Sequence, residues 1–249
     1  MPKAGVEFAK VSYTLPDGHV LLRDISLRAE AGTTTAILGR SGSGKTTLLR
    51  MVNGLARPSI GEVLVSGQRV TDSNINISRR DIGYVIQETG LFPHMTVERN
   101  AGLALEVAGR SKGEIEARAR EVLAQVGLDF DGFRGRYPWQ LSGGQRQRVG
   151  VARALAMDPE ILLMDEPFGA LDPLTRAEMQ TMLKGLLERV RKTVLLVTHD
   201  LDEALYLASR VVFLETGMIV ADLSARDVLG SDNPHVKGYV SAVHRVVTA

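Results

Sequence analysis

The sequence has no cysteine among its 249 residues, and neither sign of charge is in excess. Without cysteine, the chain can hold neither a disulfide framework nor a thiolate-bound metal. Lys and Arg total 30 against 29 for Asp and Glu, so no overall field would by itself recruit nucleic acid or an anionic membrane. With 44% hydrophobic and 24% charged residues, we expect one large globular domain, or a core domain with a smaller insertion.

Long apolar runs are missing as well. The densest ones, Ile161–Met164, Val194–Val197 and Val211–Leu214, have four residues each, whereas a membrane-spanning helix needs about 20. The mixed polar residues 1–12 do not resemble a signal peptide. Short apolar runs bounded by polar residues are typical of buried strands in a parallel sheet. We therefore expect a soluble chain.

Strand-like and helix-like segments alternate along most of the chain, and residues 87–157 are helical in pattern. This order predicts an α/β protein with a mostly parallel sheet, an N-terminal antiparallel β part and an inserted helical subdomain. Residues 1–86 and 158–249 would form the core, residues 87–157 the subdomain, and residues 235–249 a short helix or a frayed tail. The predicted strands lie within 6–27 and at 34–38, 82–86, 161–164, 193–198, 211–215 and 218–221, and the predicted core helices include 45–54, one that begins at 172–173, and 201–209.

A glycine-rich turn lies between the strand at 34–38 and the helix that begins near Lys45. Its sequence fits G-x-x-x-x-G-K-[ST], in which glycines let backbone N–H groups approach phosphates and the helix N-terminus attracts the anion. Lys45 would reach the terminal phosphates, and the Thr46 hydroxyl would bind Mg²⁺. A turn that merely starts a helix is the alternative, but eight matching positions in this context argue against it. The predicted nucleotide-binding residues here are Gly39, Arg40, Ser41, Gly42, Ser43, Gly44, Lys45, Thr46 and Thr47.

Two acids end the strand at 161–164. Asp165 is suited to hold Mg²⁺, and Glu166 to polarise an attacking water, because ligands bind at the carboxyl ends of parallel strands. The alternative is that both acids only solvate a strand end. His199 ends another apolar strand, where it would reach the γ-phosphate or serve as an ordinary surface residue.

A second glycine turn, Leu141–Gln145, precedes another predicted helix. Ser142 would cap that helix, and the N–H groups of Gly143 and Gly144 would attract an anion. A phosphate turn is already present in the chain, so this second one makes most sense if it completes the site of another subunit.

These motifs resemble the ATP-binding subunit of ATP-binding cassette (ABC) transporters, whose signature LSGGQ is present at Leu141–Gln145. The resemblance covers residues 13–217 and implies the roles that follow. Tyr13 stacks on adenine, although an ordinary strand tyrosine is the alternative. Gln87 touches Mg²⁺ or the attacking water and relays occupancy to a membrane partner. Ser142, Gly143, Gly144 and Gln145 bind the partner's nucleotide, Asp172 lies in the loop that reaches across the dimer while also capping a helix, and His199 is the switch histidine.

Within the family, Gln87–Val97 and Tyr137–Gln140 are similar to importers, in particular those for osmoprotectants such as glycine betaine and choline. The apolar residues Leu91–Pro93 would be exposed to receive a helix of a permease, or would pack inside the helical subdomain. The resemblance also implies an external solute-binding protein and a peripheral position on the cytoplasmic face of the membrane. The regulatory domain that many relatives carry after the cassette is expected to be absent or reduced.

The sequence thus predicts a homodimeric ATPase that sandwiches two ATP molecules with Mg²⁺ and drives a permease. One alternative is an exporter subunit. A second is a soluble ABC ATPase acting on DNA or ribosomes, which the neutral charge and the lack of a second cassette disfavour. A phosphate-loop kinase is disfavoured by Ser142–Gln145 and Glu166. The transported solute is not encoded in these motifs.

Overall fold

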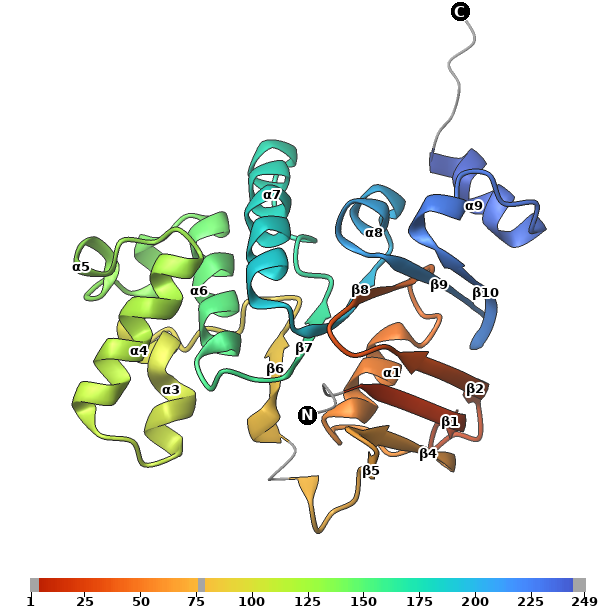
Figure 1. The fold of residues 1–249 in the computed structure, drawn as a ribbon, viewed down its shortest axis with the longest axis horizontal. Coiled ribbons are helices and arrows are strands. Elements are labelled where there is room, and N and C mark those ends of the chain that lie inside the picture. The colour runs from red at the N-terminus through yellow and green to blue at the C-terminus, as the bar shows by residue number, and fades with distance from the viewer. Residues whose placement is uncertain (1–4, 76–78, 244–249) are drawn as a thin grey trace, which may run out of the picture. The chain divides into compact units, whose positions relative to one another are not determined.

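The protein is described by a computed structural model that covers residues 5–75 and 79–243. It divides into two compact units. The first unit comprises Met1–Asn76 with Thr193–Ala249, and the second comprises Ile77–Lys192 (Figure 1). Each unit carries its own share of the residues predicted to act on a nucleotide.

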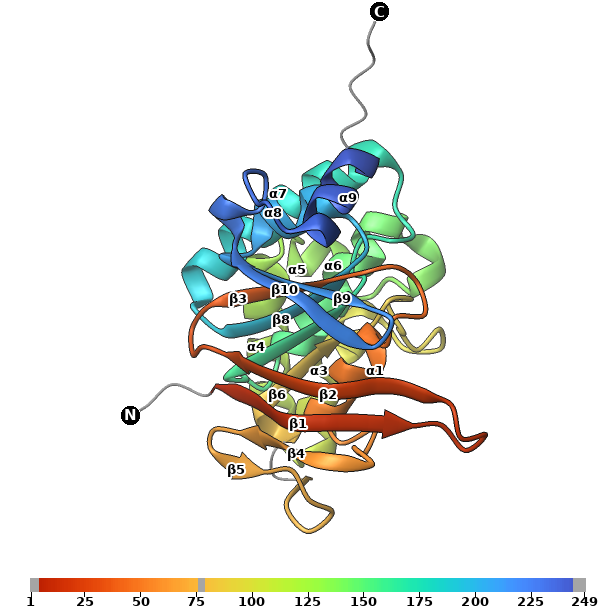
Figure 2. The same ribbon diagram turned by 90° about the vertical axis from the view of Figure 1, so that its right-hand side faces the viewer.

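The N-terminal part of the first unit is an antiparallel sheet in the strand order β2-β1-β4-β5, seen in Figure 2. In β2, Ile25, Leu27 and Ala29 are buried at every second position, as the period of two in a strand requires, and an irregularity in the pairing with β1 leaves Leu22 buried as well. The predicted N-terminal strands are confirmed, whereas β4 and β5 were not anticipated. The strands are β1 (Val6–Thr14), β2 (Val20–Ala29), β4 (Ile60–Val65) and β5 (Gln68–Arg69).

The second sheet of this unit is mostly parallel, in the order β10-β9-β3-β8. β3 runs parallel to both β8 and β9, and β10 completes an antiparallel hairpin with β9. One cluster of the core joins this sheet to α8 and α9: Leu201 and Val236 pack with Leu38 and Phe213. The predicted fold class is therefore confirmed. The elements are β3 (Thr34–Leu38), α1 (Lys45–Val52), β8 (Thr193–Thr198), α8 (Leu201–Leu207), β9 (Arg210–Glu215), β10 (Met218–Ser224), η3 (Ala225–Asp227) and α9 (Pro234–Val243).

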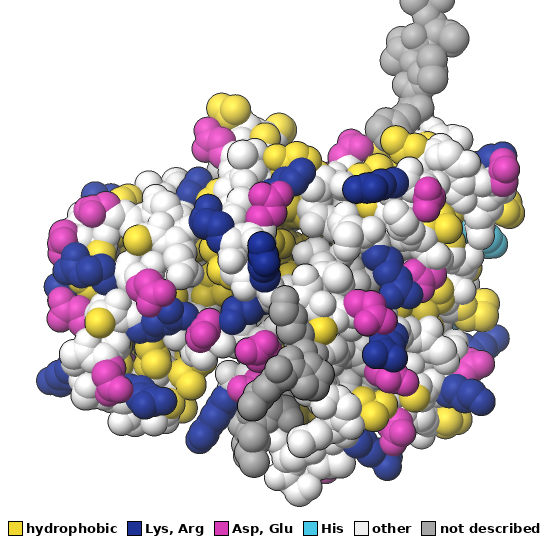
Figure 3. Space-filling model, viewed as in Figure 1, with side chains coloured by type: hydrophobic (Ala, Val, Ile, Leu, Met, Phe, Trp, Pro, Cys, Tyr) yellow, Lys and Arg dark blue, Asp and Glu magenta, His cyan; other side chains and the backbone are white. Residues whose placement is uncertain are grey.

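The second unit has a pair of parallel strands, β6 and β7, and a group of helices that gather at one end in Figure 1. The predicted capping box of α4 is present, because Glu114 N donates to the Ser111 hydroxyl and the Glu114 carboxylate accepts from Ser111 N. Charged side chains of both signs alternate over these helices in Figure 3. The elements are η1 (Arg79–Asp81), β6 (Ile82–Val85), α3 (Val97–Val107), α4 (Lys112–Gln125), α5 (Phe130–Phe133), η2 (Pro138–Gln140), α6 (Gly143–Leu155), β7 (Ile161–Asp165) and α7 (Pro173–Val190).

Two expectations concern the ends and the membrane. The helix predicted as one option for residues 235–249 is present as α9 up to Val243, and residues 244–249 lie outside the described part. Within residues 5–75 and 79–243, no helix combines the length and the apolar character needed to cross a bilayer.

Candidate nucleotide site

The predicted phosphate turn follows β3 and leads directly into α1. Gly44, immediately before the helix, has φ of 98°, and a β-carbon placed there would lie 2.6 Å from Leu22 Cδ2. Only glycine tolerates both the left-handed backbone and this close approach. Leu22 is the β2 residue that pairs with Tyr13 of β1, so the strand next to that of the predicted adenine-stacking residue lies against the turn.

The side chain of Lys45 is folded back over the turn. Its ammonium group donates to Gly39 O at 2.8 Å and to Arg40 O at 3.0 Å, and only 4% of the residue is exposed. These carbonyls hold the charge close to the backbone N–H groups that would meet a phosphate. The cation is thus placed for a triphosphate before one arrives.

One polar atom of the turn is buried without a protein partner. Ser43 is 7% exposed, and within the described residues its hydroxyl oxygen makes no hydrogen bond. An orphaned buried hydroxyl is costly unless a ligand or water satisfies it. Together with Lys45 and the N-terminus of α1, this hydroxyl fits an anionic ligand.

His199 lies at the same edge of the sheet as the phosphate turn. Leu38 and Thr198, the residues before Gly39 and His199, are paired in register between β3 and β8. His199 and Arg40 also line one cavity of about 410 Å³. The backbone at His199 is held from outside the strand, because Tyr239 of α9 donates its hydroxyl to His199 O at 3.2 Å.

In the second unit, Gln87 and Glu166 lie together. Val85 of β6 pairs with Met164 of β7, so the residues that follow both strands meet at one edge. The Gln87 amide donates to Glu166 Oε2 at 3.3 Å, and Tyr84 donates its hydroxyl to Asp165 Oδ2 at 3.2 Å. Each carboxylate is therefore oriented by a hydrogen bond from a neighbouring side chain, which suits a site for a metal and a water.

Glu166 has an unusual backbone for a residue with a side chain. Its φ is 43°, in the left-handed region that non-glycine residues seldom adopt. Asp165 remains in the strand and is 3% exposed, whereas Glu166 is half-buried. The turn after Asp165 gives the adjacent acids different environments, which suits two different roles.

The second glycine turn begins helix α6, as predicted. Ser142 accepts from Gln145 N at 3.2 Å while the Gln145 side chain accepts from Ser142 N at 3.0 Å. A β-carbon on Gly144 would lie 2.6 Å from Thr175 Cγ2, so the turn lies against the first turn of α7. Asp172 caps α7, and its hydrogen bonds with Thr175 hold the pKa of its carboxyl below the usual range, so it stays ionised at neutral pH.

The profile of the ABC transporter family matches residues 22–169, more than half of the chain. That stretch contains Lys45, Gln87, the Ser142 turn and Glu166. The chain belongs to the ABC transporter family.

Other members of the family are similar over most of the chain. The choline transport ATP-binding protein OpuBA of Bacillus subtilis is 44% identical over 219 residues, which are 88% of this chain and 57% of that protein. The sulfate/thiosulfate import ATP-binding protein CysA of Nocardia farcinica is 46% identical over 226 residues, 90% of this chain and 67% of that protein. The chain thus spans little more than half the length of the choline relative.

A solved cassette structure shares the fold. It is dimeric, in a post-hydrolysis state bound to ADP and Pi, and is 36% identical, with a TM-score of 0.79 over 89% of this chain and 99% of that one. The family resemblance inferred from the sequence is confirmed, and a choline transport protein is among the similar relatives, as the sequence predicted. The sulfate/thiosulfate relative shows that the similarity is not confined to one class of solute.

Several polar side chains that support these groups were not anticipated from the sequence. Tyr84 and Tyr239 are two of them, and Arg153 and Asn100, which bind the backbone at the two ends of the loop after Gln87, are two more. Tyr84, Tyr239 and Arg153 act through contacts between segments distant in sequence, whereas Asn100 bonds residues only four to eight positions before it. The only signal in the sequence was that these polar residues lie within otherwise apolar segments.

Proposed function

We propose that this ABC cassette is the ATP-hydrolysing, energy-coupling subunit of an importer for a small solute, of the glycine betaine or choline type. Two copies would sandwich two ATP molecules and drive a transmembrane permease from the cytoplasmic face of the membrane. The helical subdomain would be residues 87–157, inserted into a core of residues 1–86 and 158–249. The similarity to a choline transport protein supports this class of solute.

The presence of two phosphate-binding turns in one chain carries the proposal. The first precedes α1 and holds Lys45, and the second precedes α6 and is capped by Ser142. A chain needs only one of these turns to bind the phosphates of its own nucleotide. The second turn is best used on the nucleotide of another copy, and the similar solved cassette is dimeric.

Each predicted residue has a proposed role in hydrolysis. Gly39–Thr47 would bind the phosphates, Tyr13 the base, and His199 the γ-phosphate as its charge develops. Thr46, Gln87 and Asp165 would hold Mg²⁺, which when bound neutralises phosphate charge. From the partner copy, Ser142–Gln145 would close over the phosphates, and Asp172 would belong to the same contact.

Glu166 would accept a proton from water as that water attacks the γ-phosphate in line, leaving ADP and phosphate. The Gln87 amide, already on Glu166 Oε2, would orient the same water. Loss of the bridging γ-phosphate would let the two copies separate. That separation would be the step that moves the permease.

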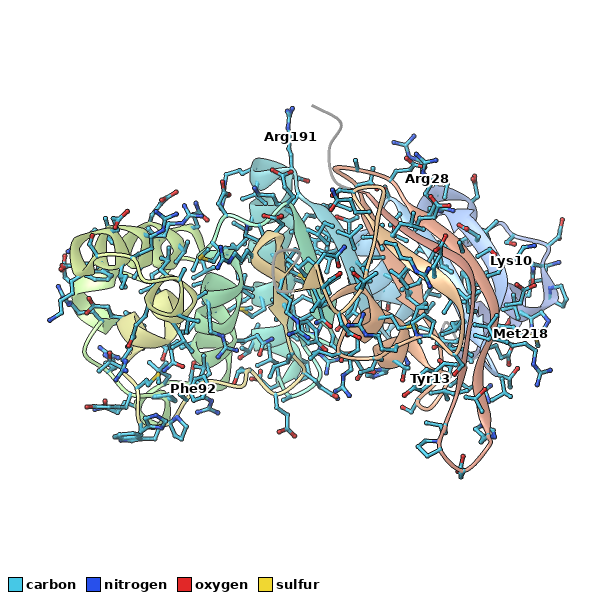
Figure 4. The ribbon with its side chains drawn as sticks, turned by 90° about the horizontal axis from the view of Figure 1, so that it is seen from below. Lys10, Tyr13, Arg28, Phe92, Arg191 and Met218 are labelled. Carbon is cyan, nitrogen blue, oxygen red and sulfur yellow. The ribbon has the colours of Figure 1, made fainter. Side chains whose placement is uncertain are left out.

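The permease would bind the loop at 87–97. Phe92 is 42% exposed in this loop and lies at the margin of the helices in Figure 4. Leu91 is half-buried and Pro93 exposed, so the apolar cluster predicted from the sequence is largely open to a partner. An external solute-binding protein would complete the importer.

Sedimentation equilibrium of Glu166→Gln with Mg²⁺ and ATP tests the sandwich. We expect a monomer without ATP and a dimer with it, because slow hydrolysis traps the bridged state. A chain that stays monomeric alone and also when co-purified with its membrane partner would exclude the sandwich.

Double-stranded DNA should leave ATP turnover unchanged, whereas stimulation would favour the alternative of an ATPase that works on nucleic acid.

Tyr13→Ala is expected to raise the KM for ATP by about tenfold with little change in kcat, since stacking on a base contributes about 1–3 kcal/mol. Steady-state ATPase assays would measure both constants. Tyr13→Phe keeps the ring and should retain the native KM. An unchanged KM in Tyr13→Ala would show that Tyr13 is an ordinary strand residue.

A further inference from the structure

Arg153 lies near the C-terminal end of α6, the helix whose N-terminus carries the Ser142 turn. Its guanidinium group donates to Thr89 O at 2.8 Å and to Gly90 O at 2.7 Å. Both carbonyls belong to the loop that starts with Gln87. Burial of the side chain lowers the pKa of Arg153, which still remains charged at neutral pH.

This loop does not hold its shape through regular secondary structure. Thr89 has φ of 31°, a left-handed conformation that a threonine seldom adopts without support. Charge-assisted bonds to two successive carbonyls provide such support. Without Arg153, the backbone two residues from Gln87 would be free to relax.

The far end of the same loop is fixed separately. Asn100 of α3 is fully buried and donates to Phe92 O, Met95 O and Thr96 O, while its own oxygen accepts from Phe92 N at 2.8 Å. Helix α3 thus anchors the exposed Phe92, and helix α6 anchors the residues directly after Gln87. Arg153 thus links helix α6 to Thr89 and Gly90 through its side chain.

We propose that Arg153 is a positioning residue for hydrolysis, which fixes the loop so that the Gln87 amide stays on the Glu166 carboxylate. It acts on Gln87 and Glu166 indirectly, through its hydrogen bonds to Thr89 O and Gly90 O. A shift of α6, whose N-terminus would bind the partner's nucleotide, is then passed to the loop of Gln87 through the hydrogen bonds of Arg153. The catalytic consequence rests on the function proposed above.

Hydrogen exchange tests the positioning role without requiring ATPase activity. Arg153→Ala is expected to speed amide exchange in residues 86–91 by about tenfold, because the loop opens more often once the two hydrogen bonds are lost. Exchange in α4 should not change. Arg148→Ala is the matched control, since Arg148 lies on the same helix and donates to Val126 O at 2.6 Å, away from this loop. Unchanged exchange at 86–91 would overturn the proposal.

A double-mutant cycle tests the path to Gln87. Arg153→Ala should lower kcat about tenfold with the KM for ATP within about twofold, and should cost less than about twofold in a Gln87→Ala background. Arg153→Lys, which can still donate to one carbonyl, should restore part of the rate and covers the case in which the alanine variant fails to fold. If Arg153→Ala lowers kcat as much in the Gln87→Ala background as in the native chain, Arg153 has a general structural role and does not act through Gln87. A chain with no ATPase activity would refute the proposed function, and the exchange result would still decide the positioning role.

Discussion

Glu166→Gln is expected to lower the ATP turnover of the purified chain by about 10²–10⁴-fold, the usual contribution of a general base. The amide keeps the shape of the side chain but has no carboxylate to accept the proton of the attacking water. Binding should change little, because Glu166, which accepts a hydrogen bond from Gln87, is proposed to act on the attacking water, whereas the phosphates are proposed to bind the turn around Lys45. Steady-state phosphate release measures the turnover, and binding of a fluorescent ATP analogue measures the affinity.

Glu160→Gln provides the control. Glu160 is an exposed acid at the other end of the same strand, directly before β7. Its replacement makes the same chemical change and should leave turnover within about twofold of the native rate, as surface substitutions usually do. Equal losses in the two variants, or native turnover in Glu166→Gln, would remove Glu166 from the hydrolytic role.

The sequence predicted the parts of the site that are local. The turn before Lys45, the caps at Ser142 and Asp172, and the acids after β7 depend on residues within a few positions of one another. Their geometry is largely set by backbone conformation and by helix capping, which leave direct traces in the residue pattern. The strands at 34–38 and 193–198 were predicted to their final residues because both are continuous runs of β-branched and aliphatic residues.

Contacts between distant segments left no comparable trace. The bond between Tyr239 and the backbone of His199 spans 40 residues, and that between Arg153 and Thr89 spans 64. Strands β4 and β5 were missed because their exposed, partly polar residues lack the apolar runs of the central strands. Local pattern therefore predicts the candidate groups for the chemistry, and tertiary packing decides which side chains hold them in place.

The second large effect is expected at Lys45. Lys45→Ala should weaken ATP binding by about 100-fold or more, because each hydrogen bond to a charged group contributes about 1.5–3 kcal/mol and the ammonium can make several to the phosphates. The ammonium group is 2.8 Å from Gly39 O, so it lies over the turn in which the triphosphate is proposed to bind. Titration with a fluorescent ATP analogue gives the change in Kd.

Folding must be separated from binding in this variant, because Lys45 also bonds two carbonyls of the turn and is buried. Thermal unfolding without nucleotide measures the first effect, and the stabilisation that added ATP provides measures the second. Arg50→Ala removes an exposed cation from the same helix and should bind ATP as the native chain does. If Lys45→Ala and the native chain gain the same stabilisation from ATP, the turn does not bind the phosphates, and the proposed sandwich fails with it.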